Sequence, residues 1–277
     1  MPTLYPISPT KLGTWLDCPR RFRLQYLDRV RTTSTWAHLS LGNAVHDTLR
    51  DWWDVAPDAR TRDRLAALLA ERWRPQGFRD DAQSAQWRAN AVVMIWHYLQ
   101  QLDPGFAPVS CERTLAARTD GQAISGRIDR LDVDPDDPEA LVVIDYKTGK
   151  RVPGDDDVRG SLALAMYAMC VQQSLRRPCT RVELHHVPSG VRVGRELSAE
   201  SLDRQRRRIE QIGAEMAAAE TAWRADGDDA AHFPPSPGPL CAWCDFRDRC
   251  PEGSAAAPAK ASWAGLPESD DEVPQVR

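Results

Sequence analysis

The sequence predicts an α/β fold in which a small mixed sheet is flanked by helices. Hydrophobic residues recur at helical spacing through the first hundred residues, short β-leaning segments separated by turn signals follow, and helical spacing then returns. The 277 residues, of which 42% are apolar, are enough to bury a substantial core. We therefore expect a single domain over residues 1–252, followed by a tail.

A helical region is expected over about residues 8–103. Ser8 and Pro9 suit the N-cap and the first position of a helix that continues to residue 30, with a turn at Cys18-Pro19. Three further helices are predicted at 40–54, 61–74 and 82–102.

The core of the domain is expected over about residues 104–225 and begins with strands. An antiparallel meander is predicted from the segments 108–118, 122–133 and 140–147, with Asp120-Gly121 in the first turn. Residues 150–160 are expected to form a loop. The rest is predicted as a helix at 161–175, a hairpin of 180–187 with 190–197, and a long helix at 199–224.

The C-terminal residues divide into a compact cysteine-containing segment at 240–252 and a tail. Residues 253–277 are rich in Ala, Pro and acidic residues and poor in bulky apolar ones, which predicts disorder.

Composition and apolar runs exclude several classes of protein. The formal net charge of −4 argues against a protein that coats nucleic acid through overall positive charge. The longest apolar run, Leu162–Val171, is too short to cross a bilayer, and the N-terminal residues lack the pattern of a secretory signal. No phosphate-binding GxxxxGK[ST] loop occurs, so an ATP-driven motor would be a separate chain. We expect a cytoplasmic protein with no membrane partner.

A predicted buried strand runs directly into two charged residues. The apolar run 141–144 is typical of a central strand, and Asp145 and Lys147 follow it. Because side chains alternate along a strand, these two project to the same side. Taken alone, the pair is better explained by a structural ion pair than by catalysis.

Asp129, one strand earlier, supplies a second carboxylate. In a meander it can lie beside Asp145, and two converging carboxylates repel unless a divalent cation lies between them. Mg²⁺ or Mn²⁺ at such a position activates a water and polarises a phosphoryl oxygen, and Lys147 could orient that water. His46, at the margin of a helical apolar face, is a candidate third ligand, although a hydrogen-bonded edge histidine is the simpler explanation of it alone.

The order of these motifs resembles the PD-(D/E)XK nuclease superfamily, and most closely the RecB-type exonucleases and their AddB-like and CRISPR-associated adaptation relatives. The motifs are the stretch 42–49 around His46, Gly-Arg-Ile-Asp-Arg at 126–130, and Val-Ile-Asp-Tyr-Lys-Thr-Gly-Lys at 143–150. The resemblance spans roughly residues 8–252 and implies a restriction-endonuclease-like core.

The resemblance also implies roles for individual residues. The implied ligands of Mg²⁺ or Mn²⁺ are His46, Asp129, Asp145 and the backbone carbonyl of Tyr146. Lys147 is the implied catalytic lysine, with Asp129 and Asp145 completing the catalytic set. Glu112 matches an acidic position often seen in such proteins and is a supporting residue, although an exposed strand glutamate explains it equally well.

One position departs from the family pattern. RecB-like sequences carry Gln-x-x-x-Tyr on the helix after the lysine strand, and here Tyr167 is present but Ala163 replaces the glutamine. Alanine cannot hydrogen-bond a nucleotide or a water. Either the loss is tolerated or activity is reduced.

Cys241, Cys244 and Cys250 form a compact group of thiolate ligands. Seven cysteines in a chain expected to be cytosolic make disulfides a poor explanation. The resemblance supplies a fourth ligand, Cys18, because iron–sulfur members of this nuclease group hold a 4Fe–4S cluster with one N-terminal and three C-terminal cysteines. A Zn²⁺ site with the same four thiolates is the alternative, since spacing alone does not separate the two.

Basic and aromatic residues near these motifs are candidates for binding single-stranded DNA. Cationic side chains neutralise phosphates, and aromatic rings stack on unpaired bases. For any single arginine, a solvated surface position is the simpler explanation. The candidates are Arg20, Arg21, Arg127, Arg130, Lys150 and Tyr167.

The resemblance implies an exonuclease that hydrolyses DNA phosphodiester bonds at single-stranded ends, in DNA repair or recombination, with a helicase or repair complex as partner. One alternative is a weakly active or inactive DNA-binding or scaffold subunit of a helicase–nuclease complex, which Ala163 favours. Another is a zinc-bearing protein–protein adaptor.

Overall fold

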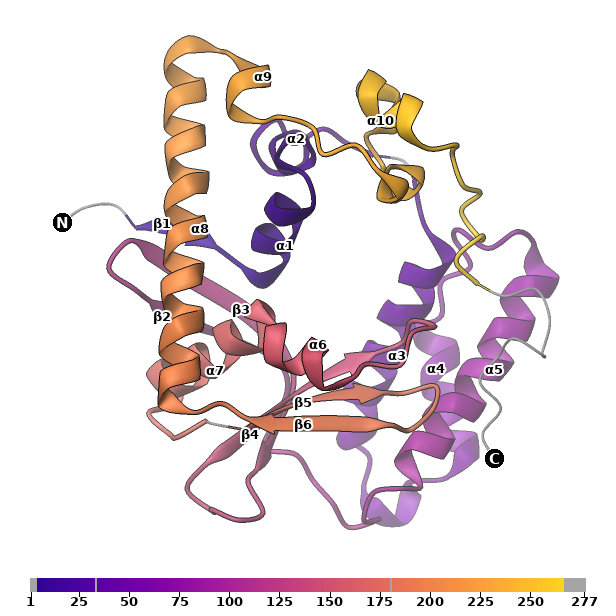
Figure 1. Ribbon diagram of the computed structural model, residues 1–277. Coiled ribbons are helices and arrows are strands. Elements are labelled where there is room, and N and C mark those ends of the chain that lie inside the picture. Colours follow the sequence, from indigo (N-terminus) through magenta and orange to yellow (C-terminus); the bar gives the residue numbers. More distant parts are fainter. Residues whose placement is uncertain (1–3, 33, 180, 267–277) are drawn as a thin grey trace.

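The computed structural model describes residues 4–32, 34–179 and 181–266 and has the mixed α/β architecture that the sequence predicts (Figure 1). Among these residues, six strands form one mixed sheet in the order β1-β3-β4-β5-β6, and β2 pairs with β3. The strands are β1 (Tyr5–Ile7), β2 (Ser110–Arg118), β3 (Gln122–Val133), β4 (Leu141–Lys147), β5 (Arg181–His186) and β6 (Arg192–Glu196). The predicted meander of β2, β3 and β4 is confirmed, because both pairs are antiparallel.

One edge of β3 is shared by two strands that leave a gap between them. β1 pairs in parallel with residues 122–124 at the start of β3, and β4 pairs antiparallel with residues 130–133 at its end. Residues 125–129 therefore have no strand partner on this edge. The cleft described below opens at this gap.

Local residue preferences explain where the N-terminal helices begin and end. α1 (Pro9–Asp17) starts at Ser8, whose hydroxyl accepts the Lys11 N–H, and ends at Cys18, which has an extended backbone. α2 (Pro19–Phe22) and a π-helical turn (Arg23–Leu27) follow. The predicted turn at Cys18-Pro19 is thus confirmed.

Helices cover both faces of the sheet (Figure 1). α3 (Ala37–Trp53), α4 (Arg62–Arg72) and α5 (Asp81–Leu99) form one core with Val142 and Ile144 of β4. α1, α7 (Leu162–Leu175) and α8 (Ala199–Asp226) form the other core, with Leu141 and Val143. The alternation of these β4 residues is that of a central strand buried on both faces.

The remaining elements are short. They are α6 (Asp155–Gly160), α9 (Asp229–His232), α10 (Pro251–Ala256) and the 3₁₀ turns Pro57–Ala59, Pro239–Trp243 and Arg247–Arg249. No helix within the described ranges is long and apolar enough to cross a membrane.

The structure differs from the sequence prediction at three short segments. β1 has only three residues and depends on pairing with β3, so it has too little periodicity to be predicted. α6 lies in the predicted loop 150–160, where Asp157 caps the Gly154 N–H. Of the tail predicted to be disordered, 253–256 belong to α10 and Leu266 is buried in the core with α3, while residues 267–277 lie outside the described part.

A chain of buried polar groups crosses the core between α5 and the sheet. The Arg130 guanidinium donates to the Tyr98 hydroxyl (3.0 Å), which lies 2.8 Å from His185 Nδ1. His185 Nε2 lies 2.7 Å from a carboxylate oxygen of Glu183. Because a carboxylate only accepts, Nε2 carries the hydrogen and the Tyr98 hydroxyl donates to Nδ1. The network thus holds a neutral imidazole, and burial lowers the pKa of His185 to about 4.

The free energy of unfolding is predicted to decrease as the pH falls from 6.5 towards 4. Over this range the unfolded chain takes up a proton on His185, whereas the folded protein, in which the His185 pKa is about 4, does not. A shift of this size corresponds to roughly 3 kcal/mol. Urea unfolding across this pH range should show the loss in the parent and a much smaller loss in His185→Gln. Equal pH dependence in both proteins would contradict the prediction.

Candidate metal centre and cleft

Three carboxylates lie in a row across three neighbouring strands. Cys111 and Arg113 of β2 pair with Arg130 and Ile128 of β3, so Glu112 lies opposite Asp129. Arg130 also pairs with Ile144 of β4 at the end of that ladder, and Asp129 and Asp145 are the next residues along the two strands. Directly opposed side chains on neighbouring strands are close enough to interact.

The sheet is irregular at this row. Glu112 has a φ of +48°, a left-handed conformation that is costly for a residue with a Cβ and is found at functional sites. The alternation of β3 also shifts, because Ile128 and Leu131 enter the same core although they are three residues apart. The Tyr146 N–H donates to Oδ2 of Asp129 (2.8 Å), so a carboxylate accepts a main-chain donor of β4. Of the three carboxylates, Asp129 lines the cleft that opens at the gap in the edge of β3.

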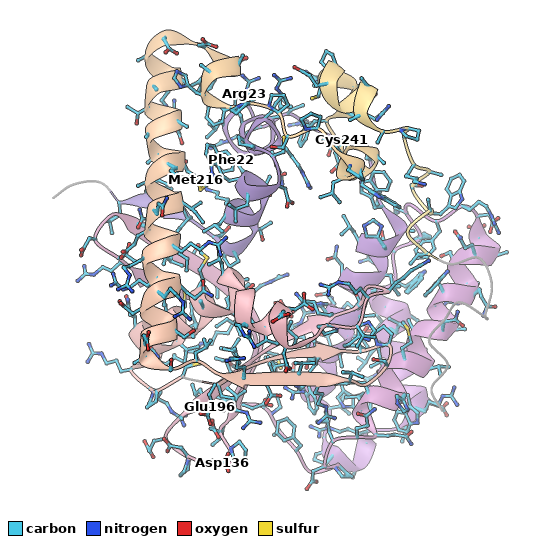
Figure 2. The ribbon with its side chains drawn as sticks, in the orientation of Figure 1. Phe22, Arg23, Asp136, Glu196, Met216 and Cys241 are labelled. Carbon is cyan, nitrogen blue, oxygen red and sulfur yellow. The ribbon has the colours of Figure 1, made fainter. Side chains whose placement is uncertain are left out.

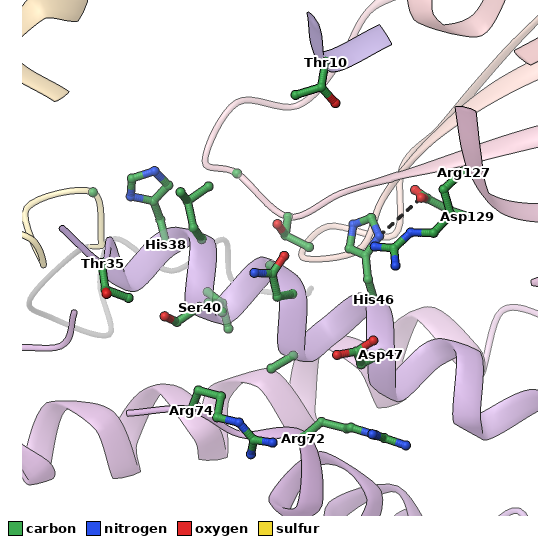
Figure 3. A pocket seen from close by; sticks show the side chains of 18 of the residues that line it. Thr10, Thr35, His38, Ser40, His46, Asp47, Arg72, Arg74, Arg127 and Asp129 are labelled. Atoms are coloured by element: carbon green, nitrogen blue, oxygen red, sulfur yellow. Dashed lines mark ion pairs between the residues drawn. The ribbon is translucent and has the colours of Figure 1, made fainter. Parts of the chain in front are cut away.

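Helix α3 brings His46 to the carboxylates. One turn earlier, a Cβ on Gly42 would lie only 3.2 Å from Oγ1 of Thr148, so glycine lets α3 approach the end of β4. His46 Nδ1 lies 3.4 Å from Oδ1 of Asp129 (Figure 3). It also lies 3.6 Å from Oε1 of Glu112. The edge of the His46 ring also meets the Tyr146 ring, with centroids 5.7 Å apart.

Ligand atoms of His46, Glu112 and Asp129 all lie within 4.8 Å of one another, a spacing suited to a metal ion. Asp145 is outside this group and forms an ion pair with Lys147. Burial raises the pKa of Asp145, and the nearby charge of Asp129 raises it further. Of the predicted ligands, the structure brings His46 and Asp129 together and places Asp145 beside them. Glu112, considered only a supporting residue, belongs to the compact group.

The carboxylates hold a proton on His46. Burial lowers the pKa of His46, but hydrogen bonds with Asp129 and Glu112 outweigh burial and raise it to about 10. The imidazolium therefore neutralises part of the acidic charge when no cation is bound. A divalent cation would have to replace that proton.

The site opens into a cleft of about 1130 Å³. Its walls come from the start of α1, from α3, from the unpaired part of β3 and from residues 148–150. Figure 3 shows Thr10 of α1 facing α3 across the cleft, with His46 and Asp129 close together at one end. Lys147 lines a neighbouring cavity of about 600 Å³ that shares Gly149 and Lys150 with the cleft.

Three of the predicted DNA-binding residues line the cleft: Arg127, Lys150 and Tyr167. Arg127 Nε lies 2.8 Å from Oε2 of Glu112, and its side chain is 65% exposed. The Tyr167 ring occupies the space that a side chain on Gly126 would fill, 2.7 Å from an ideal Cβ. Burial and the charges of the carboxylates raise the pKa of Tyr167, which keeps its phenol neutral.

The other predicted DNA-binding residues lie elsewhere. Arg20 and Arg21 line a separate cavity, which the four predicted cluster cysteines also line, and Arg20 forms an ion pair with Glu252 (2.6 Å). For Arg130 the prediction is wrong, because its side chain is 2% exposed and paired with Asp132. A buried guanidinium cannot reach a phosphate. Arg127 and Arg130 belong to the same sequence motif. The sequence alone therefore does not show that Arg127 lines the cleft and Arg130 lies in the core.

One cavity of about 160 Å³ has all four predicted cluster cysteines in its lining: Cys18, Cys241, Cys244 and Cys250. The Ser236 and Gly253 N–H groups donate to the sulfurs of Cys18 and Cys250, each at 3.4 Å. A Cβ on Gly253 would lie 3.3 Å from the Cys250 sulfur and 3.4 Å from the Cys241 sulfur, so glycine leaves this space free. Among the described residues, no three of these thiols lie within 4.8 Å of one another.

The C-terminal segment that carries Cys241, Cys244 and Cys250 contacts α3 as well as α2. The Trp36 indole, directly before α3, donates to Asp245 (2.7 Å) and packs against Trp243. The Ala37 N–H donates to the Ser262 carbonyl (3.0 Å). Together with the Arg20–Glu252 ion pair, these contacts join the C-terminal segment to α2 and to the start of α3. Figure 2 shows Cys241 on this segment across from Arg23 and Phe22.

A family model described as the PD-(D/E)XK nuclease superfamily matches residues 6–251. The crystal structure of SSO0001 is similar in 91% of this chain and 89% of that chain, with 13% identity and a TM-score of 0.39. A candidate exonuclease from Eubacterium rectale is similar in 77% of this chain and 79% of that chain, with 10% identity and a TM-score of 0.44. No curated protein matches the sequence.

Mn²⁺ is predicted to release nearly one proton per cation when it binds near neutral pH. His46, whose pKa is raised to about 10, must lose its proton before the imidazole can bind a metal. The apparent affinity should therefore increase up to about tenfold per pH unit below that pKa. Calorimetry in two buffers of different ionisation enthalpy measures the proton count. Binding without proton release, or with the same release in His46→Gln, would show that His46 is not a ligand.

Proposed function

Because the chain belongs to the PD-(D/E)XK nuclease superfamily, we propose that it is a divalent-metal-dependent DNA exonuclease of the RecB-like type. The substrate would be the single-stranded ends of DNA in repair or recombination, with a helicase as partner. One observation carries this proposal: His46, Glu112 and Asp129 converge at a cleft next to the Asp145–Lys147 ion pair.

His46, Glu112 and Asp129 would hold Mg²⁺ or Mn²⁺, with Asp145 and the Tyr146 carbonyl as further ligands. Carboxylate oxygens with one imidazole suit these cations. A cation bound there supplies Lewis-acid stabilisation of the charge that develops on a phosphoryl oxygen.

The surrounding side chains supply the rest of the chemistry. The Lys147 ammonium, held by Asp145 and about half exposed, would offset negative charge at the scissile phosphate and orient the attacking water. The exposed Arg127 guanidinium would move from Glu112 to a phosphate of the substrate. The neutral Tyr167 phenol would donate to a phosphate or stack on an unpaired base.

The four cysteines would hold a 4Fe–4S cluster. The donors suit it, because the N–H groups that point at Cys18 and Cys250 stabilise thiolates, and the absent side chain of Gly253 leaves space between the sulfurs. Four thiolates on one Zn²⁺ at 2.3 Å lie only about 3.8 Å apart. The wider spacing around a cavity of about 160 Å³ therefore favours the larger cluster.

A scaffold subunit with little or no catalysis is the second candidate, and Ala163 favours it. This residue lies one turn before Tyr167 on α7 and offers no hydrogen bond to a substrate or a water. The complete set of acidic, imidazole and ammonium groups favours the nuclease.

The parent protein is predicted to degrade end-labelled single-stranded DNA in the presence of Mn²⁺. Asp129→Ala and Lys147→Ala should each reduce the rate at least about 100-fold, because the first removes a ligand of the cation and the second removes the ammonium that offsets charge at the phosphate. Lys260→Ala, an exposed lysine outside the cleft, is the matched control and should retain parental activity. If the parent is as inert as Asp129→Ala and Lys147→Ala, the scaffold function is correct instead.

Protein purified without oxygen is predicted to be brown and to contain about four iron atoms per chain. Cys18→Ser and Cys250→Ser should lose the colour and the iron, whereas Cys170→Ser, at a buried cysteine of α7 that does not line this cavity, should keep both. The iron and zinc content and the visible absorbance of each protein are measured. A colourless protein with one zinc atom per chain would replace the iron–sulfur proposal with the zinc site of an adaptor.

A further inference from the structure

Arg130 is a charged group that the proposed mechanism does not use, and it is the largest fully buried side chain of the described residues. It follows Asp129 on β3 but points into the core formed with α3 and α5. Its guanidinium pairs with Asp132 (2.8 Å) and lies over the rings of Trp53 and Phe106, 5.5 and 5.2 Å from their centroids.

The stability of the fold alone does not account for this arginine. Burying a guanidinium costs several kcal/mol, and apolar residues of similar volume often stabilise a protein equally well or better. Its Nε has no hydrogen-bond partner, so even its own donors are incompletely satisfied. The fork geometry of the guanidinium, in contrast, is suited to holding other groups in fixed orientations.

One of the groups that Arg130 holds is Tyr146. The guanidinium donates to the Tyr146 hydroxyl (3.3 Å) and lies 5.8 Å from the centroid of its ring. Tyr146 in turn contacts two members of the metal centre. Its N–H donates to Oδ2 of Asp129, and its ring meets the edge of His46.

We propose that Arg130 is a positioning residue of the metal centre that acts through Tyr146. Asp129 and Arg130 are consecutive on β3 and contact the same residue of β4, Asp129 at its main chain and Arg130 at its side chain. Fixing the phenol fixes the ring against His46 and the N–H against Asp129, so both ligands are oriented before a cation arrives. The inference rests on the proposed function, because it concerns the same cation site.

The test measures Mn²⁺ affinity by calorimetry, independently of cleavage. Tyr146→Phe removes the hydroxyl that Arg130 holds and keeps the ring, and we expect it to weaken binding about tenfold, as the loss of an outer hydrogen bond to a metal site does. Arg130→Met should weaken binding at least as much, and Arg130→Lys should recover part of the loss. In the double variant Tyr146→Phe/Arg130→Met the effects should not add, because both remove one interaction.

Tyr98→Phe is the matched control. Arg130 also donates to the Tyr98 hydroxyl, which leads to His185. The Tyr98 ring packs against Tyr146 with centroids 5.8 Å apart, and phenylalanine keeps that ring contact while it removes the hydroxyl. The Mn²⁺ affinity of Tyr98→Phe should stay within about twofold of that of the parent, because the Arg130–Tyr146 hydrogen bond and the ring contact both remain. Because Arg130→Met could unfold the protein, Tyr146→Phe carries the test by itself once its circular dichroism and unfolding midpoint match those of Tyr98→Phe.

The outcomes separate this inference from the proposed function. If the parent binds Mn²⁺ and folded Tyr146→Phe binds it equally well, or Tyr98→Phe loses as much, Arg130 is only structural and the inference fails. The nuclease proposal then stands on its own cleavage assay. If the parent binds no Mn²⁺, the metal centre itself is refuted, and this inference with it.

Discussion

Three like charges on neighbouring strands repel one another, and the surroundings of Glu112, Asp129 and Asp145 are arranged to offset that repulsion. Two unit charges about 5 Å apart repel by about 3 kcal/mol at an effective dielectric constant near 20. Three cationic side chains form ion pairs with these carboxylates and offset the repulsion: His46 from α3, Arg127 from β3 and Lys147 from β4. The sheet therefore tolerates the acidic row only because helix and strands converge on it.

The same region is where the sheet departs from regular geometry. β1 and β4 share an edge of β3 but leave residues 125–129 unpaired, Glu112 adopts a left-handed backbone, and Gly126 makes room for Tyr167. A continuous ladder would fill this edge with main-chain hydrogen bonds and leave no space for a substrate. The interruption thus gives the side chains access to the cleft at the cost of local stability.

Much of the fold could be predicted from local patterns, because the helices and the meander have clear periodicity and turn signals. The register of β2 and β3 could also be predicted from the sequence. A tight hairpin at Asp120-Gly121 pairs residues 112 and 129, which places Glu112 beside Asp129. The burial of Arg130 could not be predicted, since Arg127 and Arg130 belong to one motif and only tertiary packing separates them. β1 could not be predicted either. Its three residues are too few to show a periodic pattern, and they form a strand by pairing with one more than a hundred residues away.

The contacts of the C-terminal segment have a consequence for biosynthesis. Trp36 and Asp245, which share a hydrogen bond, are 209 positions apart, and Arg20 and Glu252 are 232 apart. At about 5–20 residues per second, a ribosome needs roughly 10–45 s to synthesise the intervening residues. During that interval the first helices emerge without the partner that covers them, so a nascent chain exposes aromatic surface to chaperones until the cysteine-containing segment has been synthesised.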